Sequence, residues 1–219
     1  MTNKRDGLYV WVTWLSKFMA GETTCEFAPW FKSHYQNYEK APSGLDLARW
    51  QIDHTRISRD VRIEREGAGD QVLVERQTQF NWRRPNSDLV LGGKPDMIAI
   101  GDKTIRVIDI KTGQPKASHQ VQVMIYMYCL PKDAPVYRDR ILTGQLVYNS
   151  ERVDILPTAI DAKFEEQFNY FLDIIDTPDR ALKIPSMMEC RDCDITKADC
   201  DERIEDQPAL AADEDELFG

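Results

Sequence analysis

The sequence predicts an α/β fold, in which helices flank a central mixed β-sheet. Two alternating apolar runs, 97–100 and 105–111, are separated by Gly101 and Asp102, a pattern typical of a β-hairpin. Helical patterns precede and follow this hairpin, at residues 8–20, 43–65, 117–130 and 159–175. With 219 residues, of which 42% are hydrophobic and 30% charged, the chain is long enough for one well-packed domain.

The first expected helix covers residues 8–20, an apolar and aromatic run that stops at Gly21. Lys4 and Arg5 precede it, as in a secretory signal, but no small-residue cleavage site follows. The run is also shorter than the roughly 18 residues of a membrane span. We therefore expect a buried helix, in a cytoplasmic protein that has no membrane segment.

The next long helix is expected from Ser43, as its cap, to about residue 65. Along it, apolar and aromatic residues recur at steps of three and four, which places them on one inward face. This face consists of Leu47, Trp50, His54, Ile57 and Val61. Two explanations of His54 are open: a core histidine bonded to a carbonyl group, or a metal ligand.

The predicted hairpin carries charged residues that are candidates for a metal site. Residues two apart on a strand share a face, so Asp109 and Lys111 point to the same side. Ile108 and Ile110 point into an apolar layer on the other side. If the hairpin pairs Asp96 near Asp109, two carboxylates and one ammonium group converge at one end of the sheet. Such carboxylates bind hard divalent cations; the alternative is a pair of charges on an exposed face.

A helix at 117–130, stopped by Pro131, follows the hairpin. His119, Gln122 and Tyr126 lie on one face of it, a spacing that is usual for core side chains with polar tips. Further strands complete the sheet, at 72–80, 88–91, 141–148 and 152–156. The chain has no glycine-rich phosphate loop of the ATPase type, so a fused helicase or ATPase is excluded.

The net charge of −9 is concentrated at the C-terminus. Residues 199–219 hold nine acids and one base, Arg203, which leaves a charge of −1 for the rest. Composition therefore neither supports nor argues against DNA binding. We expect a folded domain at 1–204 and a disordered acidic tail at 205–219. The tail is explained as a solubilising segment, or as one that docks on a partner protein or competes with DNA.

Five cysteines without a secretion signal indicate a reducing compartment and a metal site. Cys190, Cys193 and Cys200 lie together in a short, turn-rich segment. Tetrahedral zinc and iron–sulfur clusters both need four ligands, and Cys25 is the candidate for the fourth. Cys129 is expected to pack inside a helix as a small apolar group. The alternative is two disulfides or unrelated thiols.

The order of these residues resembles that of a known enzyme family. Pro95-Asp96, twelve further residues and then Asp109-x-Lys111 resemble the PD-(D/E)XK nuclease motif. The run from Asp109 to Gly113 (Asp-Ile-Lys-Thr-Gly), with a histidine on an upstream helix and Gln-x-x-x-Tyr downstream, resembles the RecB-like branch of that family. The resemblance implies the restriction-endonuclease-like core, with its central mixed sheet between helices.

The resemblance also implies a role for each residue. Mg²⁺ or Mn²⁺ would be bound by His54, Asp96, Asp109 and the carbonyl group of Ile110. Lys111 would orient the attacking water and stabilise the transition state. Gln122 and Tyr126 would place this lysine and the DNA strand. Catalysis is thus expected to involve Asp96, Asp109, Lys111, Gln122 and Tyr126.

One cysteine before the core and three after it resemble the 4Fe-4S nucleases. These are the CRISPR-associated RecB-like exonuclease (the fourth Cas family) and the nuclease domain of AddB. The resemblance implies a 4Fe-4S cluster on Cys25, Cys190, Cys193 and Cys200. It would act as a structural clasp between Cys25 and the segment 186–203, and zinc is the alternative metal.

The function implied is that of a metal-dependent DNA exonuclease, acting on single-stranded ends and leaving a 5′-phosphate and a 3′-hydroxyl. The expected setting is CRISPR adaptation or DNA recombination and repair, with CRISPR integration or recombination proteins as partners. One alternative is a viral or solitary recombination exonuclease. The other is a module that binds DNA or a partner protein, with cleavage secondary.

Overall fold

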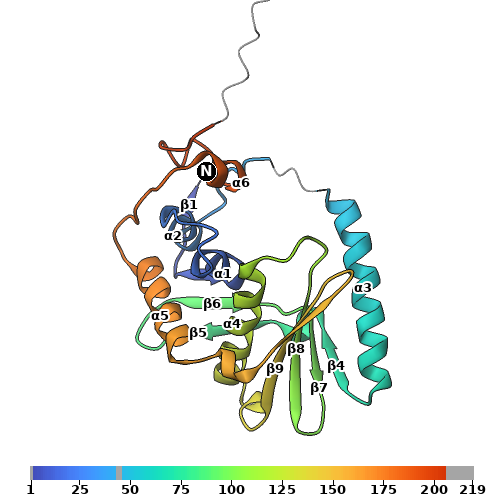
Figure 1. The fold of residues 1–219 in the computed structure, drawn as a ribbon. Coiled ribbons are helices and arrows are strands. Elements are labelled where there is room, and N and C mark those ends of the chain that lie inside the picture. The colour runs from blue at the N-terminus through green and yellow to red at the C-terminus, as the bar shows by residue number, and fades with distance from the viewer. Residues whose placement is uncertain (1, 43–45, 206–219) are drawn as a thin grey trace, which may run out of the picture.

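Two sheets form the frame of the molecule. The structure, a computed structural model, describes residues 2–42 and 46–205 (Figure 1). The main sheet has five strands in the order β10-β9-β8-β7-β4. They cover Arg152–Ile155, Ile141–Val147, Thr104–Ile110, Met97–Ile100 and Gln71–Val74. The smaller sheet has the order β2-β6-β5, formed by Tyr9–Trp11, Val90–Gly93 and Phe80–Arg83.

The central strand of the main sheet is β8. It pairs antiparallel with β7, through the predicted hairpin, and parallel with β9. A tight turn cannot join parallel strands, and α4 (Ala117–Asp133) makes the crossover between β8 and β9. The predicted mixed sheet with flanking helices is therefore confirmed.

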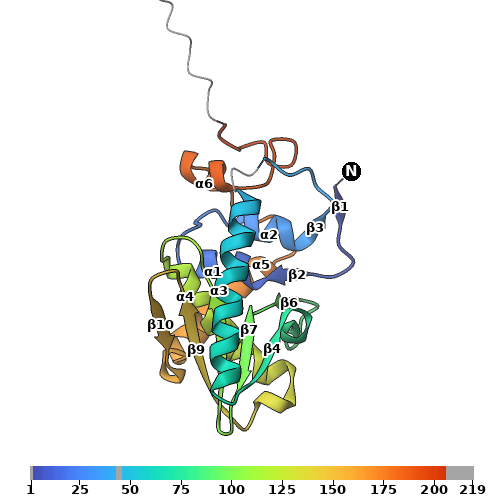
Figure 2. The same cartoon turned by 90° about the vertical axis from the view of Figure 1, so that its right-hand side faces the viewer.

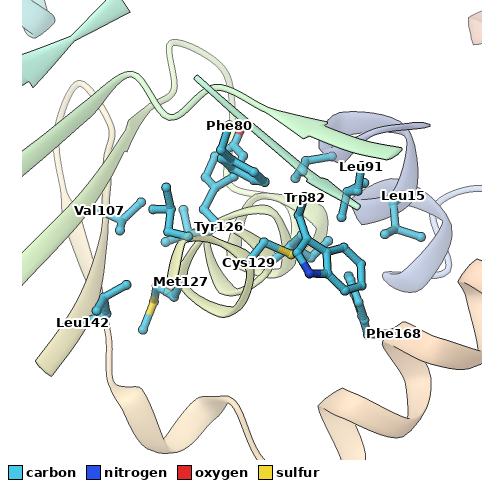
Figure 3. Close-up of a cluster of buried hydrophobic side chains, with 14 of the residues drawn as sticks. Leu15, Phe80, Trp82, Leu91, Val107, Tyr126, Met127, Cys129, Leu142 and Phe168 are labelled. Carbon is cyan, nitrogen blue, oxygen red and sulfur yellow. The ribbon is translucent and has the colours of Figure 1, made fainter. Parts of the chain in front are cut away.

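The two faces of β8 pack against different helices. Ile108 and Ile110 belong to an apolar cluster with Ile57 of α3 (Leu47–Gly67). Val107 points the other way, into the larger cluster around α4 that Figure 3 shows. The alternation predicted for this strand is thus confirmed, and α3 and α4 lie on opposite sides of the sheet (Figures 1 and 2).

Four shorter helices and one strand pair complete the described chain. The helices are α1 (Val12–Met19), α2 (Phe27–His34), α5 (Ala162–Asp176) and α6 (Met187–Asp192). The strand pair is β1 (Asn3–Lys4) with β3 (Tyr35–Gln36). Helix α1 contacts both α4 and α5, so the chain ahead of the hairpin packs on the chain behind it. Helix α6 lies beside the segment that leads into α2 (Figure 1).

Three predicted elements differ from the structure. The helix predicted at 8–20 begins as strand β2, because its aromatic and β-branched residues pair in parallel with β6. The strand predicted at 72–80 is divided between the two sheets by a turn at Glu75, where φ is +54°. Helix α4 runs through Pro131 to Asp133 and so ends later than predicted.

The long helix α3 also begins and packs differently from the prediction. Asp46 is its cap, since the Asp46 carboxylate accepts a hydrogen bond from the Arg49 amide at 3.0 Å. The predicted cap, Ser43, lies outside the described residues. Of the predicted inward face, Ile57 and Val61 are buried, whereas Leu47 and Trp50 are exposed.

Among the helices of the described residues, none is both long and apolar enough to cross a membrane. The predicted acidic tail lies outside the described residues from position 206 onward. Its disorder, and the division of the chain at residue 204, stay predictions.

Candidate active site

The antiparallel register of β7 and β8 brings two carboxylates to one end of the sheet. Met97 pairs with Ile108, which places Asp96, the residue before β7, across from Asp109. The Ile110 amide donates a hydrogen bond to Asp96 Oδ2 at 2.7 Å, which closes this end of the hairpin. The predicted convergence of Asp96 and Asp109 is therefore present.

Helix α3 contributes His54 to the same end of the sheet. His54 Nε2 lies 3.2 Å from Asp96 Oδ2, and both side chains are about three-quarters or more buried. The hydrogen bond with Asp96 raises the pKa of His54, while partial burial opposes the rise. His54 thus contacts a carboxylate, which distinguishes it from the core histidine bonded to a carbonyl group that was the alternative.

Asp109 is a buried carboxylate in an unusual electrostatic state. It is 2% exposed, and burial raises its pKa to about 6 although the Lys111 ammonium opposes the rise. Lys111 Nζ lies 2.6 Å from Asp109 Oδ2 as an ion pair. Within the described part of the chain, however, this buried oxygen accepts no hydrogen bond of good geometry. It therefore has coordination capacity left for a cation.

Helix α4 connects the lysine to the rest of the site. Lys111 Nζ donates to Gln122 Oε1 at 2.9 Å, and Gln122 Nε2 donates to the Tyr126 hydroxyl oxygen at 2.7 Å. Gln122 Nε2 also lies 3.4 Å from Asp109 Oδ1. Gln122 and Tyr126 are both buried, and burial raises the pKa of Tyr126 well above its usual value. One amide side chain thus links the carboxylate, the ammonium group and the phenol.

Several contacts with backbone groups hold these side chains in position. The sequence does not predict them. The Lys111 amide donates to the Val147 carbonyl at 2.9 Å, which anchors the residue after β8 to β9. The Thr78 hydroxyl donates to the Pro95 carbonyl and so holds the turn ahead of Asp96. At Gly93 a Cβ atom would lie 2.9 Å from the Tyr126 ring, so glycine allows this ring to approach. No motif signals contacts of this kind.

The residues at this end of the sheet suit a hard divalent cation. The donors available are the His54 imidazole, the carboxylates of Asp96 and Asp109, and the Ile110 carbonyl group. The buried Asp109 Oδ2 without a hydrogen bond fits such an ion. As the side chains stand, no three His, Cys, Asp or Glu groups of the described residues are close enough to hold a metal ion. Binding would therefore require side chains to move, beginning with the Lys111 ammonium group.

Four of the five cysteines lie around one cavity at a distance from this site. Cys25, Cys190, Cys193 and Cys200 line a cavity of about 590 Å³, and all five cysteines are free thiols. As the side chains stand in the described residues, no three of these thiols are close enough together to hold a metal ion. Burial raises the pKa values of Cys193 and Cys200. Cys129 is fully buried within α4 and packs as the predicted apolar group.

The walls of this cavity are held by acidic side chains. The Glu189 carboxylate accepts hydrogen bonds from the Thr24 amide, the Thr24 hydroxyl and the Cys25 amide, at 2.7 to 3.1 Å. Asp194 accepts from the Tyr38 hydroxyl at 3.1 Å and pairs with Lys32 at 2.5 Å. The segment around Cys190 is therefore joined to the segment around Cys25 by polar contacts that need no metal.

Residues 13–201 match the family described as the PD-(D/E)XK nuclease superfamily. The chain belongs to this superfamily. The match spans every residue of the site and all five cysteines. PD-(D/E)XK proteins are nucleases that generally use Mg²⁺ or Mn²⁺, so membership implies a metal-dependent nuclease with DNA as its substrate. The match is to the superfamily and does not distinguish the RecB-like branch within it.

One solved structure is similar to this chain in its fold. The crystal structure of SSO0001 is similar over 93% of this chain and 90% of that chain, with a TM-score of 0.51 and 15% sequence identity. At this identity the likeness concerns the fold alone. Among curated proteins no match is found.

Proposed function

We propose that this PD-(D/E)XK protein is a metal-dependent exonuclease that hydrolyses phosphodiester bonds at single-stranded DNA ends. The observation that supports cleavage is the contact between the buried Asp109 carboxylate and Lys111, whose ammonium group Gln122 holds from the other side. A carboxylate and an ammonium group side by side, next to Asp96 and His54, are the groups that hydrolysis of a phosphodiester requires.

In this proposal His54, Asp96, Asp109 and the Ile110 carbonyl group hold Mg²⁺ or Mn²⁺. The bound ion would lower the pKa of a water molecule and neutralise charge on the phosphate. Lys111 would leave its ion pair with Asp109 to orient the water and to face the charge that develops on the phosphate. Gln122 would guide the lysine, and Tyr126 would hold Gln122 in place.

The physiological role belongs to the proposal as well. The resemblance of the motif order to RecB-like nucleases supports DNA recombination and repair or CRISPR adaptation, with the proteins of those processes as partners. The resemblance is also what supports single-stranded ends as the substrate and an exonucleolytic mode of cleavage. A viral or solitary recombination exonuclease would use the same site in the same way.

We propose further that the cysteine cavity holds a 4Fe-4S cluster that ties the chain ahead of the core to the chain behind it. The support is that Cys25, Cys190, Cys193 and Cys200 line one cavity, whereas Cys129 lies elsewhere. Thiols with raised pKa values lose their protons when a metal binds, so binding would be favoured by alkaline pH. Zinc would use the same four ligands.

The test is an iron, sulfide and zinc analysis of anaerobically purified protein, together with a nuclease assay in Mn²⁺ on single-stranded and duplex DNA. We expect brown protein with about four irons and cleavage that EDTA abolishes. Cys25→Ala should lose the iron, and Cys129→Ala, the matched control, should keep it. If the protein is active and colourless and contains zinc, the cysteine cavity holds zinc and not the proposed cluster. If the protein binds DNA but does not cleave it with any metal ion, the proposed nuclease activity is wrong and the protein is a DNA-binding module.

A further inference from the structure

The apolar face of α3 continues beyond the sheet that it covers. Ile57 and Val61 are 6% and 2% exposed because they pack on the main sheet. About two and three turns closer to the start of α3 the same face holds Trp50 and Leu47, which are 42% and 65% exposed. Figures 1 and 2 show the first turns of α3 extending past the ends of the strands that it covers. The exposed half of the face lies next to the candidate active site.

Trp50 contacts the site directly. Its ring centroid lies 5.0 Å from that of His54, and the two rings are tilted by 31°. His54 in turn contacts Asp96. Among the exposed large hydrophobic residues of the described chain, the aromatic ones are Trp50 and Tyr170. Tyr170 lies on α5 and packs against Phe171, so Trp50 is the exposed aromatic side chain at the carboxylates.

We propose that Trp50 is a stacking platform for a nucleobase of the DNA strand that is being cut. This inference rests on the proposed nuclease function and adds a residue that binds the substrate. An unpaired nucleobase offers an apolar face that stacks on indole whatever its identity. The strand being cut would contact the metal ion that Asp96 and Asp109 hold, and it would therefore pass close to His54, the residue against which Trp50 packs. Leu47, one turn away, extends the apolar surface.

The stacking platform would also favour single strands over duplexes. In a duplex both faces of a base are already stacked on its neighbours, so a base must leave the stack to reach Trp50. In a single strand that cost is small. Alanine substitution of stacking aromatics in single-strand binding proteins costs about 1–3 kcal/mol per base. The expected effect at Trp50 is therefore about a tenfold loss of affinity.

The test compares Trp50→Leu with Trp50→Phe, using Tyr170→Leu as a control on an exposed aromatic side chain far from the site. The dissociation constant of a short fluorescein-labelled oligothymidylate is measured in EDTA, where cleavage does not interfere. We expect Trp50→Leu to weaken binding about tenfold, Trp50→Phe to restore most of it, and Tyr170→Leu to bind like wild type. In cleavage assays Trp50→Leu should raise KM more than it lowers kcat. Far-UV circular dichroism checks that each variant is folded.

A second experiment removes the nucleobase from the DNA and leaves the Trp50 indole unchanged. An abasic nucleoside is moved through the oligothymidylate, and we expect one position to weaken wild-type binding but not that of Trp50→Leu. Equal effects of the abasic site on both proteins would overturn the stacking platform, as would unchanged affinity in Trp50→Leu. A third outcome would also overturn it: the wild-type protein is a dimer, Trp50→Leu is a monomer, and both bind DNA equally well. Trp50 would then be a contact between two copies of the chain. Binding is measured in EDTA and so does not depend on cleavage. A wild-type protein without nuclease activity would therefore contradict the proposed function, while the binding data would still test the role of Trp50.

Discussion

The ends of β7 and β8 and the cysteine cavity are built in different ways. At the strand ends Asp109, Lys111 and Gln122 contact one another directly, so each functional side chain fixes the next. Around the cavity the cysteines line one space, but neighbours such as Glu189 hold the loops that carry them. The first region has its side chains already in contact, although a metal ion would still require the Lys111 ammonium group to move away from Asp109. In the second region the surrounding polar contacts are formed, and the four cysteines are free thiols.

This difference predicts how substitutions in each region would affect the rate of cleavage and the stability of the protein. A substitution inside the Asp109–Lys111–Gln122 group removes a contact that the chemistry uses, so it should lower the rate of cleavage whether it raises or lowers stability. A substitution in the frame of the cavity removes a contact that joins distant parts of the chain, so it should change stability and spare the rate. The following experiments test that division.

The largest effect is expected from Lys111→Met. This variant keeps most of the side-chain length and removes the ammonium group, so the rate of cleavage should fall about a thousandfold or more. The protein should still fold, with a lower melting temperature at pH 8, because the buried Asp109 carboxylate loses its paired cation. Cleavage is followed on labelled single-stranded DNA and unfolding by circular dichroism. Lys103→Met, at an exposed position in the turn of the same hairpin, is the control and should cleave normally. Near-normal cleavage by Lys111→Met would show that the ion pair serves structure alone.

Asp109→Asn should stabilise the metal-free protein at alkaline pH. The folded-state pKa of Asp109 is raised from 3.8 to about 6, so this carboxyl contributes stability below pH 4 and loses it as the pH rises through 6. The ionised group then costs about 3 kcal/mol at pH 8, which the amide avoids. Urea unfolding in EDTA should show the gain at pH 8 and little gain at pH 4. The same substitution at the exposed Asp102 is the control, and a gain that does not depend on pH would contradict the prediction.

Gln122→Leu tests the bridge between the lysine and the phenol. Leucine fills a similar volume in α4 but cannot accept from Lys111 or donate to Tyr126, whose present distances are 2.9 and 2.7 Å. We expect kcat to fall about thirtyfold, or roughly 2 kcal/mol, with little change in KM, because the lysine loses its orientation. Tyr126→Phe should have a smaller effect in the same direction. A rise in KM with kcat unchanged would mean that Gln122 binds DNA and does not orient Lys111.

The smallest effect on cleavage is expected from Glu189→Gln. The amide keeps one acceptor but loses the charge that Thr24 and Cys25 face. Because these contacts are partly exposed, we expect a loss of about 1 kcal/mol and a melting temperature lower by about 2–4 °C. Cleavage at low temperature should be unchanged. Asp192→Asn, at an exposed position on the same helix, is the control, and slow cleavage by a stable Glu189→Gln protein would show that the two regions are coupled.

The hairpin could be predicted because it is local in sequence. Gly101 and Asp102 set the turn, and the two-residue period of the strand then determines that Asp109 and Lys111 share a face. Helical spacing likewise predicts that Gln122 and Tyr126 share a face of α4. The structure adds what spacing does not contain, namely that this face of α4 is the one directed at Lys111.

Other features depend on partners far along the chain. Residues 9–11 form a strand because β6, about 80 positions later, offers an edge for parallel pairing. The pattern at 72–80 is continuous in sequence, but the 3₁₀ helix Glu75–Thr78 divides it, so that β4 pairs with β7 and β5 pairs with β6. Periodicity predicts the apolar face of α3 correctly, but it does not reveal that the sheet beneath ends before Trp50 and Leu47.

The order in which β8 meets its two neighbours matters while the protein is being synthesised. β7 directly precedes β8, so the hairpin with Asp96 and Asp109 can form as soon as β8 has left the ribosome. β9 emerges only after α4, and the bond from the Lys111 amide to the Val147 carbonyl must wait for it. A nascent chain that stops before β9 therefore carries the carboxylates without an anchored lysine. The parallel crossover thus delays completion of the candidate active site until most of the protein has been made.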